Sequence, residues 1–154
     1  MKNYFLLTLV ACLAFSCNKY DPDQQLEDDI ADIKAYLDER GITGAIQTES
    51  GLFYIIDDEG TGNEHPTINS TVNCNYVGFL LDEDGTVFDA GAGVQFALAN
   101  VIKGWQEGIP KLKRDGSGRL FVPSTLAYGN QRQGQFIGKN EILGFSVTLN
   151  NFWE

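Results

Sequence analysis

From residue 50 onward, the chain is a series of short β-rich segments separated by turn signals. Asp84-Gly85 is a hairpin signal between two of them. One stretch, Ile102–Leu112, has a helical pattern, and Gly108 and Pro110 limit its length. Strands joined by hairpins pair in antiparallel fashion, so the sequence predicts an α+β fold in which an antiparallel sheet packs on one short helix. The expected strands are Leu52–Ile56, Val72–Leu81, a run from Val87, a run with Phe96 and Leu98, Arg119–Pro123 and Ile142–Phe152.

A separate N-terminal helix is expected before these strands. Asp21 can cap its start, Pro22 suits the first helical position, and Gln24 is placed to close a capping box. Gly41 is suited to end the helix. This helix fits two interpretations, packing on its own domain or acting as a spacer or dimerising helix, and the sequence leaves both open. Its apolar residues form a narrow stripe at Leu26, Ile30, Ile33 and Leu37.

Residues 1–16 have the features of a secretory signal. Lys2 supplies a positive charge, and the apolar run Tyr4–Phe15 is shorter than the about 20 residues that a membrane-spanning helix needs. The end of this run, Leu13–Cys17, resembles a bacterial lipobox, although Phe15 is bulkier than that motif prefers. We therefore expect lipidation at Cys17, which would anchor the protein to a membrane of the bacterial cell envelope, facing the periplasm or the surface. Ordinary signal cleavage, with Cys17 incidental, is the alternative.

This reading divides the chain into three parts. Residues 1–16 are the lipoprotein signal, residues 17–49 are a lipidated tether with the amphipathic helix, and residues 50–154 are the folded domain. Cys12 would leave with the signal. Cys74 would then be the one free thiol, and its alternation with Val72 and Tyr76 favours a small buried side chain on a strand.

The charged residues exclude several kinds of function. The chain has 21 acidic and 11 basic residues, a net charge of −10, which argues against nucleic acid as a partner because phosphates need a basic surface. His65 is the only histidine and precedes a proline in a polar loop, so we expect a surface residue. Neither a metal site, a cofactor nor a catalytic triad is predicted.

The order and spacing of several short motifs carry a family resemblance. Over about a hundred residues, the chain resembles the FKBP-type peptidyl-prolyl isomerases, the immunophilins that bind macrolides. The resemblance implies a curved antiparallel sheet on a short helix, catalysis of cis–trans exchange at proline, and proline-containing polypeptides and macrolide inhibitors as ligands. The motifs are Ser50–Tyr54, Gly60–Gly62, Val72–Gly78, Val87–Asp89, Phe96–Leu98, Val101–Trp105 with Glu107-Gly108, Val122-Pro123, Ala127–Gly129, Ile137 and Leu143–Phe145.

The resemblance also implies roles for individual residues. Trp105 would be the floor of an apolar pocket, and Ile137 would cap it. Tyr128 would aim its hydroxyl at a substrate carbonyl, as would the backbone N–H of Ile102. Asp89 would pair with the Tyr76 hydroxyl or polarise the reacting amide. We leave Phe96 as a core residue. The walls would be Tyr76, Phe88, Val101, Ile102 and Phe145, with Val94 where many family members have an aromatic residue.

Four departures from the family pattern bear on function. They are Ala90-Gly91 in place of small hydroxyl residues, Val94, Gly138 in place of the usual proline, and the polar loop 130–136. An isomerase that assists the folding of exported proteins is the first hypothesis. The second is an FKBP-like chaperone or partner-binding lipoprotein with weak catalysis, and the third is a structural or ligand-capturing surface lipoprotein.

Overall fold

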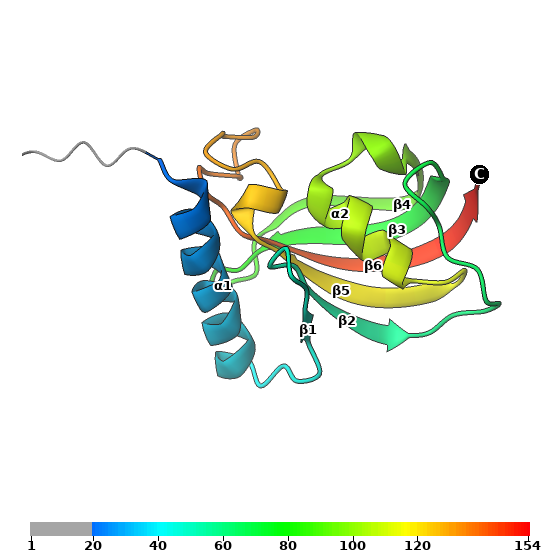
Figure 1. Ribbon diagram of the computed structural model, residues 1–154, viewed down its shortest axis with the longest axis horizontal. Helices are drawn as coiled ribbons and strands as arrows, with labels where there is room; N and C mark the ends of the chain where they lie inside the picture. Colours follow the sequence, from blue (N-terminus) through cyan, green and yellow to red (C-terminus); the bar gives the residue numbers. More distant parts are fainter. Residues whose placement is uncertain (1–19) are drawn as a thin grey trace, which may run out of the picture.

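The computed structural model describes residues 20–154 and contains one curved six-stranded sheet (Figure 1). The strands lie in the order β1-β2-β5-β6-β3-β4, and every neighbouring pair is antiparallel. The predicted α+β fold is confirmed. The strands are β1 (Ile46–Gln47), β2 (Phe53–Asp58), β3 (Thr71–Leu80), β4 (Val87–Ala97), β5 (Gly116–Val122) and β6 (Leu143–Trp153).

Two α-helices and three 3₁₀ turns complete the fold. They are α1 (Pro22–Glu39), η1 (Leu98–Asn100), α2 (Lys103–Gly108), η2 (Ile109–Lys111) and η3 (Ser124–Leu126). The helix expected over 102–112 is therefore a six-residue α-helix followed by a 3₁₀ turn that contains Pro110, a residue without a backbone N–H. Leu98, expected on a strand, instead begins η1, where its N–H donates to the Ser70 carbonyl at 3.0 Å.

The two faces of the sheet bury different side chains. On β2, Phe53 and Ile55 belong to one apolar cluster, whereas Tyr54 and Ile56 pack against the other. On β5, Phe121 joins the first cluster and Leu120 and Val122 join the second. This alternation is the period of two that a strand imposes. The helix α2 lies on the second face, and α1 covers part of the first.

Close approach of α2 to the sheet depends on two glycines one turn apart. A Cβ at Gly104 would lie 2.4 Å from Val122 Cγ1, and a Cβ at Gly108 would lie 2.7 Å from both Leu120 Cδ atoms. Positions i and i+4 share one helix face. The bare face of α2 therefore rests directly on β5, which brings Trp105 to the sheet.

The N-terminal helix packs on its own domain, as the first of the two interpretations predicts. Ile33 and Leu37 are buried against β2 and β5. Asp21 is the N-cap, and its carboxylate accepts from the Asp23 N–H at 3.0 Å. Half of the capping box predicted for Gln24 forms: its N–H donates to the Asp21 carboxylate at 3.4 Å, whereas its side-chain amide donates to Asp28 at 3.0 Å.

The helix ends as the sequence predicts. Gly41 has φ +62°, a conformation that glycine adopts without strain, and its N–H donates to the Asp38 carbonyl at 3.1 Å. The Ile42 N–H donates to the Leu37 carbonyl at 2.8 Å. This pair of bonds is a Schellman motif, and it turns the chain from α1 toward β1.

Cys74 and His65 lie where the sequence predicts them, in the core and at the surface. Cys74 is fully buried, and burial raises the pKa of its thiol to about 12. His65 is exposed, with Nδ1 at 3.1 Å from the Leu112 carbonyl oxygen. The signal and Cys17 lie outside the described residues. Among residues 20–154, no helix is long and apolar enough to cross a membrane.

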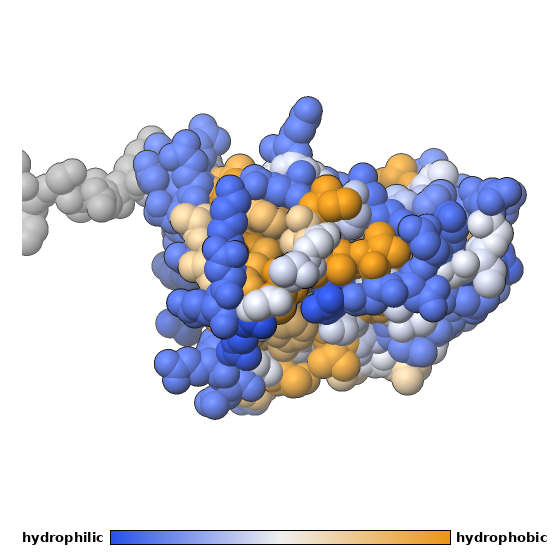
Figure 2. Space-filling view, turned by 90° about the horizontal axis from the view of Figure 1, so that it is seen from below, coloured by the Kyte–Doolittle hydropathy of each residue, from blue (hydrophilic) through white to orange (hydrophobic). Residues whose placement is uncertain are grey.

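The edge formed by β1 was not predicted. Figure 2 shows the molecule from below, and hydrophobic residues gather in the middle of the face in view, with hydrophilic residues around them. The strand β1 has only two residues, and its Ile46 is 53% exposed. So short a strand gives no readable alternation, which is why the sequence pattern missed it.

Replacing Ile33 with alanine should lower the free energy of unfolding by about 2–4 kcal/mol, because it opens a cavity between α1 and the sheet. Denaturant unfolding followed by circular dichroism measures this loss. Lys34→Ala, an exposed change on the same helix, should stay within about 0.5 kcal/mol of the unmodified protein. Equal effects of the two changes would contradict the packing of α1.

Candidate functional site

An aromatic hollow of about 330 Å³ lies between α2, the sheet and the turn after η3. Besides the buried Trp105 indole N–H, its polar side-chain groups are two tyrosine hydroxyls, one carboxylate and one amide. The lining residues are Tyr76, Phe88, Asp89, Phe96, Asn100, Val101, Ile102, Trp105, Tyr128 and Phe145. Such a hollow suits an apolar ligand that is oriented by a small number of hydrogen bonds.

The floor of the hollow is a set of aromatic rings in edge-to-face contact around Trp105. Its ring centroid lies 5.2 Å from Tyr76, 5.4 Å from Phe96 and 5.4 Å from Phe145. Phe88 extends the set through Phe145 at 5.6 Å. Edge-to-face pairs contribute about 0.5–1.5 kcal/mol each beyond the area they bury, so the shape of the floor is well fixed. The Trp105 indole N–H is buried and has no partner within residues 20–154.

One hydrogen bond orders the rim of the hollow. The Tyr76 hydroxyl donates to Asp89 Oδ2 at 2.8 Å. Tyr76 comes from β3 and Asp89 from the neighbouring edge strand β4, where Asp89 is opposite Gly78. Burial, followed by the bond to this carboxylate, raises the pKa of Tyr76 to about 12. The phenol is therefore a stable donor at neutral pH, and it holds the Asp89 carboxylate at the mouth of the hollow.

The segment before α2 presents a backbone donor. Gln106 clamps this segment, because its side-chain amide donates to the carbonyls of Ala99 at 3.1 Å and Val101 at 2.9 Å. The Ile102 carbonyl accepts the first two bonds of α2, from Trp105 and Gln106. No hydrogen bond within the described part of the chain uses the Ile102 N–H. This N–H is thus fixed in place and available to a ligand.

Tyr128 lies in the turn that follows η3, and 37% of it is exposed. Its two neighbours are tied to one carbonyl, since the N–H groups of Ala127 and Gly129 donate to the Ser124 oxygen at 2.9 and 2.8 Å. The Gly129 carbonyl in turn accepts from the Asn140 N–H at 2.8 Å. The ring is therefore carried by a braced turn at the edge of the hollow.

The structure gathers most of the predicted site residues in this hollow. Those that line it are Tyr76, Phe88, Asp89, Val101, Ile102, Trp105, Tyr128 and Phe145. Val94 and Ile137 are not among the lining residues. The sequence interpretation left Phe96 as core, although it lines the hollow, and it did not consider Asn100. A large apolar side chain on a strand gives no signal that separates a pocket wall from the core.

Val94 and Ile137, the two predicted site residues that do not line the hollow, both pack close to residues that do. Val94 packs beside Gly91 and Tyr76: a Cβ at Gly91 would lie 2.6 Å from Val94 Cγ2 and 2.7 Å from Tyr76 Cε1. Ile137 is 8% exposed and belongs to the same apolar cluster as Trp105. A backbone bridge with Gln133 holds it there. Val94 therefore lies next to the Tyr76 ring over Gly91, and Ile137 packs into the core.

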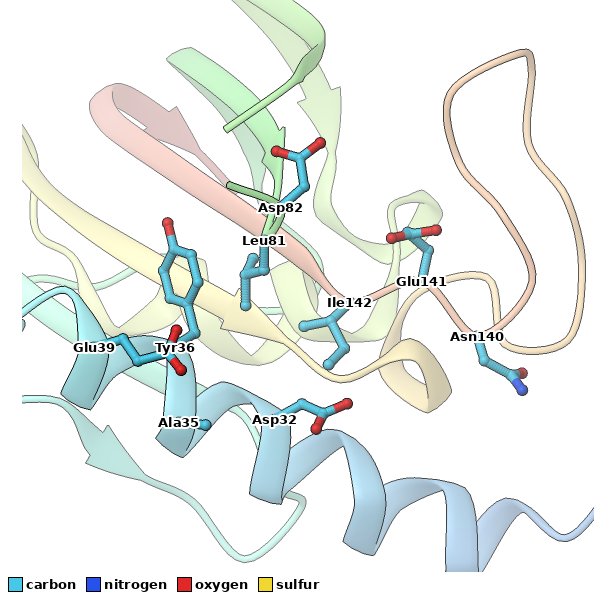
Figure 3. Close-up of a pocket in the computed structure, with 9 residues that line it drawn as sticks. All are labelled: Asp32, Ala35, Tyr36, Glu39, Leu81, Asp82, Asn140, Glu141 and Ile142. Carbon is cyan, nitrogen blue, oxygen red and sulfur yellow. The ribbon is translucent and has the colours of Figure 1, made fainter. Parts of the chain in front are cut away.

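A second hollow, of about 410 Å³, lies between α1 and the segments around Leu81 and Glu141 (Figure 3). It contains none of the predicted site residues. Carboxylates line it from both sides, at Asp32, Glu39, Asp82 and Glu141. Within residues 20–154, no group of three or more His, Cys, Asp or Glu side chains is placed to hold a metal ion. The aromatic hollow is thus the better candidate for a functional site.

Comparison with known families agrees with this geometry. Residues 62–150 match the model of the FKBP-type peptidyl-prolyl cis-trans isomerase family. The chain belongs to this family. The matched range contains every residue that lines the aromatic hollow, so the FKBP assignment and the hollow concern the same part of the molecule.

Individual FKBP relatives are similar over the same region. A probable FKBP-type isomerase, FkpA, from Neisseria meningitidis serogroup B is 41% identical over 121 residues, covering 75% of this chain and 43% of the relative. The outer membrane protein MIP of Legionella longbeachae is 41% identical over 110 residues, covering 69% of this chain and 46% of the relative. The chain thus spans less than half the length of these curated relatives.

A solved FKBP structure has the same arrangement of elements. The crystal structure of FkpA from Escherichia coli superposes with a TM-score of 0.70 at 33% identity, covering 85% of this chain and 62% of that chain. A peptidyl-prolyl cis-trans isomerase from Pseudomonas syringae superposes with the same score at 27% identity, covering 88% of this chain and 98% of that chain. The FKBP-like fold predicted from the sequence is confirmed.

The ionisation of Tyr76 tests the geometry of the rim. Its phenol should titrate near pH 12 in NMR spectra of protein with ¹³C-labelled tyrosine rings. Asp89→Ala removes the acceptor and its negative charge but leaves the burial, so the Tyr76 pKa should fall part of the way to the ordinary 10.0. Asp84→Ala, in the exposed β3–β4 turn, should leave it unchanged. An unaltered Tyr76 pKa in Asp89→Ala would refute the hydrogen bond.

Proposed function

We propose that this chain is a peptidyl-prolyl cis-trans isomerase that acts on proline-containing polypeptides and assists the folding of exported proteins. The observation that supports it most is the aromatic hollow around Trp105, which lies inside the family match. The hollow offers an apolar floor for a proline ring together with oriented hydrogen-bond donors at its edge.

The reaction suits a site without nucleophile or general base. Rotation about the amide C–N bond has a barrier of about 18–20 kcal/mol, because that bond has partial double-bond character. No covalent bond breaks. At the twisted transition state the amide loses resonance and its charge separation falls. An apolar hollow therefore destabilises the planar, more polar amide relative to the twisted one, and only such differential interactions accelerate the reaction.

Each lining residue then has a distinct task. Trp105 would support the proline ring, between walls that include Phe88, Phe145 and Val101. The Tyr128 hydroxyl and the Ile102 N–H would donate to carbonyls of the substrate. Asp89, already held by Tyr76, would face the reacting amide. Macrolide inhibitors would occupy the same hollow, because they too present an apolar ring and carbonyl acceptors.

The cell envelope is the proposed location. One relative at 41% identity is named an outer membrane protein, and the apolar run Tyr4–Phe15 supports export. The lipobox-like end of that run supports attachment through lipid on Cys17. A single acyl chain binds a membrane only weakly, so lasting attachment requires the several chains that full lipoprotein processing adds.

Peptide exchange tests the isomerase directly. The purified protein should accelerate cis–trans exchange of a proline peptide, measured by NMR exchange spectroscopy. Tyr128→Phe removes one neutral hydrogen bond to the substrate and should lower kcat/KM by about threefold to tenfold. Val77→Thr, an exposed change on β3 outside the hollow, should leave kcat/KM unchanged.

Two other results would redirect this proposal. An exchange rate equal to that of buffer, together with binding of unfolded polypeptides, would favour the chaperone without useful catalysis. If neither a proline peptide nor a macrolide binds, a structural lipoprotein becomes the better reading. A Tyr128→Phe variant with full activity would remove Tyr128 from the site but leave the isomerase in place.

Cys17→Ala tests the anchor. The thiol is the attachment point for lipid, so the variant should lose metabolic labelling with a radioactive fatty acid and leave the membrane fraction. Cys74→Ala is the matched control, because Cys74 is buried in the folded domain and should not affect labelling. Unchanged labelling and membrane association of Cys17→Ala would rule out this anchor.

A further inference from the structure

A carboxylate is buried where α1 meets the turn before Tyr128. Asp29 is 1% exposed, and Ser124, the first residue of η3, is fully buried. Asp29 Oδ2 accepts from the Ser124 N–H at 2.7 Å and from the Ser124 hydroxyl at 2.6 Å. Its other oxygen accepts from the Gln25 side chain at 2.8 Å. The pair joins residues 95 positions apart in the sequence, and Figure 1 shows η3 beside α1.

Ser124 is also bonded to both neighbours of Tyr128, the tyrosine of the hollow. The carbonyl of Ser124 accepts from the N–H groups of Ala127 and Gly129, the two neighbours of Tyr128. Ser124 is thus hydrogen-bonded both to Asp29 of α1 and to the turn that carries Tyr128. A change in the backbone orientation of Ser124 would displace the carbonyl that holds both of those amides, and with them the ring between them.

We propose that Asp29 is a positioning residue, which holds the Tyr128 hydroxyl at the edge of the hollow through Ser124. This inference rests on the proposed isomerase function. Asp29 does not line the hollow and would not touch the substrate. Its effect on catalysis would pass through the turn. Replacing Asp29 should therefore change kcat more than KM.

The contact between Asp29 and Ser124 is a pair of hydrogen bonds, which orients the turn as well as attaching the helix α1. Ile33 and Leu37 already attach α1 by apolar burial, which has no preferred direction. Burying a carboxylate is unfavourable unless its oxygens are hydrogen-bonded, so apolar packing would attach a helix more simply. What the carboxylate adds is direction, because two bonds from one residue to one oxygen fix the orientation of the Ser124 backbone.

The experiment measures proline-peptide exchange by the purified full-length protein and its variants. Asp29→Ala removes the acceptor and should lower kcat by about threefold to tenfold, as Tyr128→Phe does, with little change in KM. Asp29→Asn keeps an oxygen that can accept the Ser124 bonds and should stay within about twofold of the unmodified protein. Leu37→Ala is the matched control: it loosens α1 at a buried site with no bond to η3, and should keep kcat while folded.

A double-mutant cycle separates positioning from general loss of structure. If Asp29 acts through Tyr128, Asp29→Ala should add no further loss of kcat in the Tyr128→Phe background. Equal loss in both backgrounds, or full activity of Asp29→Ala, would overturn the proposal. Should Asp29→Ala fail to fold, Ser124→Ala, which loses only the hydroxyl bond, takes its place and should show the same non-additivity with about a twofold loss.

Amide hydrogen exchange gives a readout that does not need activity. The Ala127 and Gly129 amides should exchange faster in Asp29→Ala than in Leu37→Ala, while the β5–β6 amides remain protected in both. An inactive unmodified protein would defeat the proposed function, and exchange would still decide whether Asp29 braces the turn. Equal exchange at Gly129 in the two variants would overturn the positioning role.

Discussion

The structure depends on the register between β2 and β5, which sorts apolar side chains onto the two faces of the sheet. Phe53 is opposite Phe121, and Tyr54 is opposite Leu120. The first pair faces α1 and the second faces α2. A slip of one residue would move each set to the opposite face, where it would meet the wrong helix. The helices α2 and α1 therefore pack on opposite faces of these two strands, each on the apolar surface that the register provides.

The core and the floor of the hollow are built from the same rings. Trp105 and Phe145 are 4% and 5% exposed, values typical of core residues, yet both line the hollow. Their edge-to-face contacts stabilise the domain and also define the shape offered to a ligand. Changes to these rings would alter stability and binding together. The polar groups of the site, at Tyr128 and Asp89, are exposed and can be changed with less disturbance of the fold.

The sequence predicted the elements that have strong local signals. The cap at Asp21, the end of α1 at Gly41 and the shortness of α2 all depend on residues that act within one turn of chain. The alternating strands were readable for the same reason. Local patterns could not separate Phe96 as a wall from Phe96 as core, because that difference depends on which ring stands opposite, and Trp105 is nine residues away on another element.

The role proposed for Asp29 could not be predicted from the sequence, because it depends on a partner far along the chain. It is one of several acidic residues on the helix, and although its spacing from Leu26 and Ile33 places it on the apolar stripe, that spacing gives no sign of a polar partner. Its partner Ser124 is 95 residues further on. Asp23, Asp28 and Asp32 have the same side chain and are exposed. Only the docking of α1 beside η3 distinguishes the one carboxylate that carries hydrogen bonds into the domain.

The two hydrogen-bond donors of the hollow, the Ile102 N–H and the Tyr128 hydroxyl, are held in place by different parts of the chain. The Ile102 N–H is fixed within its own segment by the Gln106 side chain. Tyr128 lies on a turn, and turns are held less firmly than strands unless something braces them. Its brace reaches back to α1, although the family match begins only at residue 62. For a reaction that depends on oriented donors over an apolar floor, the unit proposed for catalysis therefore extends from the FKBP region into the N-terminal helix.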